Sequence, residues 1–131
     1  MPLRPTITAL LSMLCSLACA ADPCAAPSNT IEDNACARHR FEAQDRLLNS
    51  TYQALLKQLP EKNDPPFTGE GPRALLVKAQ RRWVAFRDAD CAAKHQLYIG
   101  GTVRTVVYFG CMRERTEQRI KELSAAEWQG G

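Results

Sequence analysis

The feature that most constrains this chain is the placement of its helix breakers. From Thr30 to Leu59, and again from residue 73 to residue 99, the chain contains neither proline nor glycine. These two stretches are separated by the segment PEKNDPPFTGEGP (residues 60–72), which holds four prolines and two glycines. Long stretches without breakers on both sides of a proline-rich connector are typical of paired helices.

Apolar residues recur at helical spacing in the first stretch. We expect a helix from Thr30, which resembles a capping box with Asp33 three residues later, to Leu59, directly before Pro60. One stripe of this helix should face the core. It includes Asp45 among the apolar residues Phe41, Leu48, Tyr52, Leu55 and Leu59.

Two further helices are predicted. Pro72 suits the first turn of a second helix that reaches about Tyr98 and ends at Gly100-Gly101. Thr102 or Thr105 can cap a third helix that runs to about Ala126. The predicted inner faces are Leu76, Ala79, Trp83, Phe86 and Asp90 in the second helix, and Phe109, Met112, Thr116, Ile120 and Leu123 in the third. The fold class expected is all-α, a small antiparallel bundle of three long helices.

The first 20 residues have the features of a secretory signal peptide. One basic residue, Arg4, precedes an uncharged apolar stretch that ends in Ala18-Cys19-Ala20. We expect cleavage after Ala20, which leaves residues 21–131 as a single domain; lipoprotein processing at Cys19 is the alternative. The apolar stretch is too short for a membrane-spanning helix, and we expect no transmembrane segment elsewhere.

Of the six cysteines, Cys15 and Cys19 belong to the predicted signal peptide. A small exported domain with the remaining four is expected to form two disulfides. Three pairings are open, since spacing alone does not determine which cysteines join. We favour Cys24–Cys36 and Cys91–Cys111, because each pair closes a short loop.

Three segments carry a recognisable pattern: CARHRFEAQDRLLNSTYQALLKQL (residues 36–59), LLVKAQRRWVAFRDADC (residues 75–91) and CMRERTEQRIKEL (residues 111–123), with Gly100-Gly101 before the last. Together they resemble the lysozyme inhibitor LprI-like family of small exported bacterial domains. The motif residues are Cys36, Asp45, Leu48, Asn49, Tyr52, Gln80, Trp83, Arg87, Asp88, Cys91, Gly100, Gly101, Cys111, Thr116, Arg119 and Leu123. The resemblance covers roughly residues 24–123 and implies the fold, export, the disulfides and a lysozyme-inhibiting activity. Arg115 departs from the pattern, which often has an apolar residue there.

Arg87 lies one helical turn from Trp83 and one from Cys91, so these three residues share a face. A guanidinium group there can stack on the indole and reach a carboxylate of a neighbouring helix. Asp45 is the expected partner, because a buried charge requires one. We therefore interpret the motif residues as mainly structural, with Asp88 a solvated neighbour. The alternative is that Arg87 and Asp88 contact a ligand or an enzyme.

Neither catalysis nor a cofactor is indicated by the sequence. The chain lacks a glycine-rich phosphate loop, a GxSxG motif and an HExxH motif. Cys36 with His39, and Cys91 with His95, would suit a zinc site only with reduced cysteines. We expect no catalytic residue, no cofactor and no metal. The net charge of +3 is too small to indicate nucleic acid as a partner.

The connector of residues 60–72 is the predicted site of partner contact. It carries Glu61, Asp64 and Glu70 and one aromatic residue, Phe67. An acidic loop with an aromatic anchor could dock on a basic lysozyme; the alternative is an ordinary connector whose Phe67 packs on the core. We expect a binding protein that occludes a muramidase cleft. A structural, envelope-associated helical protein is the alternative, and the oligomeric state stays open.

Overall fold

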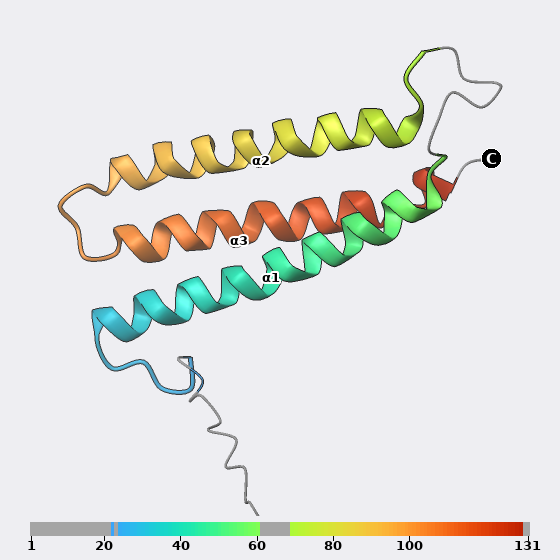
Figure 1. The fold of residues 1–131 in the computed structure, drawn as a ribbon. Helices are drawn as coiled ribbons and strands as arrows, with labels where there is room; N and C mark the ends of the chain where they lie inside the picture. The colour runs from blue at the N-terminus through green and yellow to red at the C-terminus, as the bar shows by residue number, and fades with distance from the viewer. Residues whose placement is uncertain (1–21, 23, 61–68, 130–131) are drawn as a thin grey trace, which may run out of the picture.

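The computed structural model describes residue 22 and residues 24–60 and 69–129 of the chain. It contains the helices α1 (Thr30–Gln58), α2 (Pro72–Leu97) and α3 (Arg104–Leu123), followed by the short 3-10 helix η1 (Ala126–Gln129) (Figure 1). There is no strand in these ranges. The predicted all-α bundle of three long helices is confirmed. The predicted signal peptide, residues 1–20, lies outside the described residues.

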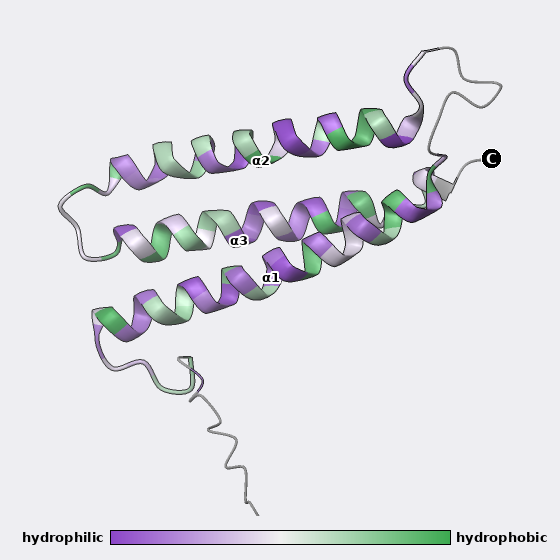
Figure 2. Cartoon of the chain, viewed as in Figure 1, coloured by the Kyte–Doolittle hydropathy of each residue, from purple (hydrophilic) through white to green (hydrophobic). Residues whose placement is uncertain are grey.

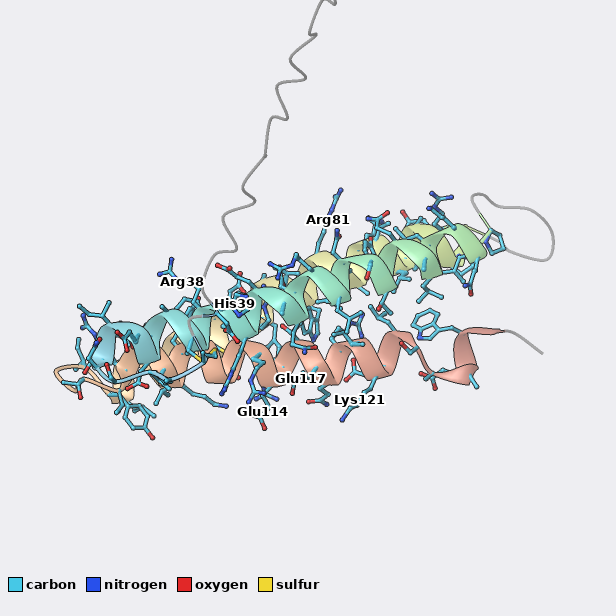
Figure 3. The ribbon with its side chains drawn as sticks, turned by 90° about the horizontal axis from the view of Figure 1, so that it is seen from below. Arg38, His39, Arg81, Glu114, Glu117 and Lys121 are labelled. Atoms are coloured by element: carbon cyan, nitrogen blue, oxygen red, sulfur yellow. A yellow bond between two sulfur atoms is a disulfide. The ribbon has the colours of Figure 1, made fainter. Side chains whose placement is uncertain are left out.

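The last helix of the sequence, α3, packs against both of the others. α1 and α3 run in the same direction, and α2 is antiparallel to both (Figure 1). In the view from below, α1 and α2 lie on the same side of α3 (Figure 3). Hydrophilic residues occur along the length of all three helices (Figure 2), which leaves only a narrow apolar stripe on each helix for the core.

The apolar core consists of two clusters. One cluster is built from the buried leucines Leu48, Leu55, Leu56, Leu76 and Leu123, with Trp83 and Trp128 packed against it. The other cluster contains Cys91, Cys111 and Met112, with Phe41 and Tyr108 packed against it. Along α2 and α3, the buried polar residues Gln80, Arg87 and Thr116 fall between the two clusters. The centre of the bundle is therefore held by polar contacts as well as by apolar burial.

The start of α1 differs from the prediction. The side-chain oxygen of Asn29 accepts hydrogen bonds from the backbone N–H groups of Ile31 and Glu32, at 3.0 and 3.1 Å. Asn29 is therefore the N-cap, and the predicted capping box of Thr30 with Asp33 is wrong. Asparagine is among the most favourable cap residues, because its short side chain reaches the free N–H groups of the first turn.

The ends of α3 also differ from the prediction. Val103 precedes the helix and no side chain caps it, so neither Thr102 nor Thr105 has the predicted role. Gly100, with a φ of 88°, allows the chain to reverse before α3 instead. The helix ends at Leu123 rather than near Ala126, and the indole N–H of Trp128 in η1 donates to the backbone oxygen of Glu122 at 3.0 Å.

The inner face of α2 is rotated from the predicted one. Its buried residues are Leu76, Gln80, Arg87 and Cys91. Phe86 is 56 % exposed and Ala79 is exposed, so placing these two in the core was wrong. Arg87 takes the inner position beside Phe86, because polar partners on the other helices offset the cost of its burial.

Within the described ranges, no helix is long and apolar enough to span a membrane.

Candidate functional site

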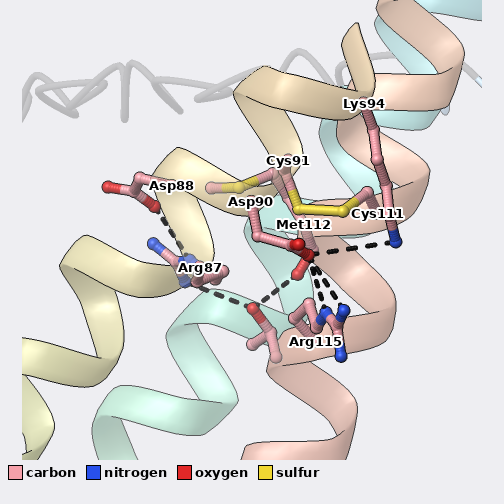
Figure 4. The surroundings of a disulfide bond; sticks show 9 residues. Arg87, Asp88, Asp90, Cys91, Lys94, Cys111, Met112 and Arg115 are labelled. Carbon is pink, nitrogen blue, oxygen red and sulfur yellow. Dashed lines mark hydrogen bonds and ion pairs between the residues drawn. A yellow bond between two sulfur atoms is a disulfide. The ribbon is translucent and has the colours of Figure 1, made fainter. Parts of the chain in front are cut away.

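The motif residues of the three helices converge on Arg87, which is only 6 % exposed. Its Nη1 atom donates to Asp45 Oδ1 of α1 at 2.8 Å and to Thr116 Oγ1 of α3 at 3.2 Å. Its Nε atom donates to Asp88 Oδ1 at 3.0 Å (Figure 4). The predicted pair of Arg87 with Asp45 is present, and Asp88 is not merely a solvated neighbour. One guanidinium group thus joins all three helices.

Two aromatic rings hold the same guanidinium group in place. The Arg87 Cζ atom lies 5.2 Å from the ring centroid of Trp83 and 5.4 Å from that of Phe41. Such contacts attract a cation to the electron-rich ring face, and they strengthen when water is excluded. Trp83 lies one helical turn before Arg87 on the same face of α2, which places its indole ring against the guanidinium group.

A second arginine links α3 to α2 one turn further along the bundle. Arg119 Nε donates to Gln80 Oε1 at 3.1 Å, and its Cζ atom lies 5.8 Å from the Trp83 ring centroid. Trp83 therefore contacts both arginines. The motif residues Gln80, Trp83, Arg87, Thr116 and Arg119 form one connected interhelical network.

A shallow groove borders this network between α1 and α2. It has a volume of about 260 Å³ and is lined by Asp45, Leu48, Asn49, Tyr52, Gln80, Val84 and Arg87. Of the motif residues that line the groove, Asn49 is exposed, whereas Tyr52 is partly buried against the leucine cluster; neither belongs to the network. The groove is too open to enclose a substrate, and the chemistry of its lining is that of a scaffold or a contact surface.

Arg115, the departure from the family pattern, has a partner of its own. Its Nε and Nη2 atoms donate to Asp90 Oδ2 at 3.1 and 2.9 Å, and Lys94 Nζ lies 3.9 Å from the same oxygen (Figure 4). The Arg115 Cζ atom also lies 5.9 Å from the ring centroid of Phe86. A charged residue is tolerated at this turn because it remains 35 % exposed while pairing with Asp90.

The four cysteines among the described residues form the two disulfides that the sequence favoured. Cys24 is bonded to Cys36, with the Cα atoms 4.7 Å apart, and Cys91 to Cys111, with the Cα atoms 5.6 Å apart. The first ties the segment before α1 to that helix, and the second joins α2 to α3. The sulfur atoms are therefore not available as thiolate ligands, which removes the zinc sites considered with His39 and His95.

The predicted contact residues of the connector are only partly placed. Glu61, Asp64 and Phe67 lie outside the described residues, and their contact with a partner stays a prediction. Glu70 is exposed and accepts a hydrogen bond from Lys78 Nζ. An acidic side chain held by a lysine of the same protein offers less charge to a basic partner.

Sequence reasoning missed the turn between α2 and α3. Leu97, Ile99 and Val103 are 82, 69 and 52 % exposed there, and Tyr98 is 46 % exposed. The signal available in the sequence was an apolar run, LYI, placed directly before two glycines at the end of a helix. From the sequence alone, this run serves only to place the end of the second helix.

The comparisons with known proteins show the family of this chain. The family model described as lysozyme inhibitor LprI matches residues 20–123. The chain belongs to the lysozyme inhibitor LprI family. It is 30 % identical over 138 residues to an uncharacterized protein of Rhizobium meliloti (strain 1021), covering 92 % of this chain and 94 % of that protein. No solved structure matches the chain.

Proposed function

We propose that this protein is an exported binding protein that inhibits a muramidase by occluding its substrate cleft. The observation that carries the proposal is the match to the lysozyme inhibitor LprI family over residues 20–123. Occlusion requires a rigid surface complementary to the enzyme and no catalytic residue. A bundle joined at its centre by Arg87 and at one end by the Cys91–Cys111 disulfide supplies such rigidity.

Export is part of this proposal. The first 20 residues have the features of a secretory signal peptide, and residues 21–131 would be the mature domain. The two disulfides support export, because disulfides persist in oxidising compartments such as the periplasm and the extracellular space. Processing at Cys19 would add a lipid anchor to the same domain.

A turbidity assay tests the proposed activity. Purified residues 21–131, with both disulfides formed, should slow the lysis of a cell-wall suspension by a muramidase in a dose-dependent manner. The matched control is the same protein after reduction and alkylation, which should inhibit less because its rigid surface is lost. Uninhibited lysis at molar excess, across muramidases of different structural classes, would favour a structural protein of the envelope. A pull-down from envelope extract would then identify its partner.

A further inference from the structure

Exposed apolar side chains gather at the turn between α2 and α3. The described part of the chain has nine exposed large apolar side chains. Five of them belong to residues 97–106: Leu97, Tyr98, Ile99, Val103 and Val106. Single exposed apolar residues are normal on a protein surface, but a contiguous group indicates an interaction site. We define residues 97–106 as the apolar turn.

The apolar turn stands at one extremity of the molecule. It projects beyond the first residues of α1 in two perpendicular views (Figures 1 and 3). Asn34 of α1 lies beside it, because this residue lines a shallow pocket together with Gly100, Gly101 and Arg104. A projecting apolar tip can enter a concave surface, which a flat helix face cannot do.

Contacts at its base and within it brace the apolar turn. The Cys91–Cys111 disulfide joins the two helices at its base. The ring centroids of His95 and Tyr108 lie 5.7 Å apart in an edge-to-face contact across the same helices. Within the turn, the Gly101 N–H donates to the Tyr98 backbone oxygen at 3.0 Å. A surface ordered before binding loses less conformational entropy when the complex forms.

The apolar turn itself carries one charged side chain, the positive guanidinium group of Arg104. No carboxylate occurs between Asp90 and Glu114, whereas Lys94, Arg104 and Arg113 lie in that interval. Lys94 is close to Asp90, but Arg104 is exposed and has no carboxylate partner among the described residues. The first turn of α1 carries two acidic residues, Glu32 and Asp33, and Glu32 accepts hydrogen bonds from Ser28.

We propose that the apolar turn is the inhibitory element and inserts into the substrate cleft of a muramidase, an inference that rests on the proposed function. Glycoside hydrolases carry a pair of carboxyl groups in a cleft that binds sugar rings. Arg104 would pair with a cleft carboxylate, and Tyr98 and Ile99 would occupy the apolar surface on which sugar rings pack.

An anionic membrane is the other surface that an apolar, positive tip could meet. Stable membrane attachment through charge requires a cluster of about four to eight lysines and arginines. On α3, Arg113, Arg115 and Arg119 are paired with carboxylates, and Arg104 is the one basic residue within the apolar turn itself. The charge pattern therefore favours an acidic cleft over a membrane.

The test uses a double variant of the mature protein and a matched control. Ile99→Ser with Arg104→Glu removes one apolar anchor and reverses the charge of the apolar turn. Ile99 lies outside the helices, and a glutamate in the first turn of α3 suits the helix dipole, so folding should be kept. The control, Leu75→Ser with Arg81→Glu, makes the same chemical changes at exposed positions of α2 away from the apolar turn.

The double variant should lose inhibition by about tenfold or more, as expected for an interface anchor, while the control inhibits as the wild type does. Circular dichroism and the melting temperature should be unchanged in both. Equal inhibition by wild type and double variant would overturn this inference and leave the proposed function standing. A wild type that inhibits no muramidase would overturn both. Binding of the wild type to vesicles containing phosphatidylglycerol, lost in the double variant, would assign the turn to a membrane instead.

Discussion

At the scale of single residues, Arg87 shows how a charge can be buried in a small bundle. Its three polar partners lie on three different helices: Asp45 on α1, Thr116 on α3 and Asp88 on α2, the helix of Arg87 itself. Thr116 is fully buried and its hydroxyl also donates to the Met112 backbone oxygen at 2.7 Å. The network leaves Asp45 about half exposed, so water shares in solvating that carboxylate.

Replacing Arg87 with alanine should destabilise the bundle. The variant loses three hydrogen bonds and two ring contacts and leaves Thr116 in a cavity, which we expect to cost about 2–3 kcal/mol after allowing for the exposure of Asp45. For a domain of this size the melting temperature should fall by roughly 10–20 °C in thermal denaturation. Muramidase inhibition below the melting temperature should change little, because the Cys91–Cys111 disulfide still braces the apolar turn. An unchanged melting temperature with lost binding would instead make Arg87 a contact residue.

Glu32 should titrate below the usual range of a glutamate. Hydrogen bonds from the backbone N–H and the hydroxyl of Ser28 stabilise its carboxylate, and this lowers the pKa of Glu32. Because the pKa is lower in the folded state, the contribution to stability is present above the usual pKa of glutamate. It is lost as the pH falls through the lowered value.

A carbon-13 NMR titration of the side-chain carboxyl groups measures the effect directly. The Glu32 midpoint should lie below the ordinary value for a glutamate and return toward it in the Ser28→Ala variant. The residual effect of the backbone N–H should remain in that variant. A midpoint at or above the ordinary value would show that this hydrogen-bonded start of α1 does not form.

At the scale of the elements, the two disulfides have different tasks. Cys24–Cys36 attaches the segment before α1 to its first turns, and Cys91–Cys111 fixes α2 against α3 at the base of the apolar turn. Cys91 is fully buried among Met112 and its neighbours, whereas Cys24 is only partly buried. The second disulfide is therefore part of the core, and the first is peripheral to it.

Removal of the second disulfide should cost more stability than removal of the first. A disulfide across a sequence separation of 20 residues is expected to contribute about 3 kcal/mol. The Cys91→Ala, Cys111→Ala variant should lose about this amount in urea denaturation and should also inhibit less, because the apolar turn is no longer held. The matched Cys24→Ala, Cys36→Ala variant should lose less and keep inhibition. Equal losses of stability and of inhibition in the two variants would show that the Cys91–Cys111 disulfide is no more important for the apolar turn than the Cys24–Cys36 disulfide.

The elements were largely predictable because their signals are local. Pro60 and Gly100 end helices by backbone geometry, and the apolar stripe of α1 gave its inner face correctly at Leu48 and Leu55. Asn29 was missed as a cap because Thr30, beside it, is also a capping residue. Phe86 was misplaced because the orientation of α2 is set by the polar partners of Arg87 on two other helices, which no local pattern contains.

At the scale of the whole molecule, apolar burial and apolar exposure lie at opposite ends of the bundle. The leucine cluster and η1 close the end where α1 finishes and α2 begins, and the polar network joins the middle. The opposite end presents the apolar turn above the Cys91–Cys111 disulfide. The apolar composition of this turn can be read from the sequence. Its exposure cannot, because burial depends on whether another helix covers the turn.

The central claim, that this protein occupies a muramidase cleft, is tested most directly by a competition experiment. Residues 21–131 are titrated into a muramidase by calorimetry, with and without a chitooligosaccharide that fills the cleft. Binding should occur with the free enzyme and weaken in proportion to the occupancy of the cleft by the sugar. Absence of binding to the free enzyme, or binding of equal strength to the sugar-filled enzyme, would contradict the claim.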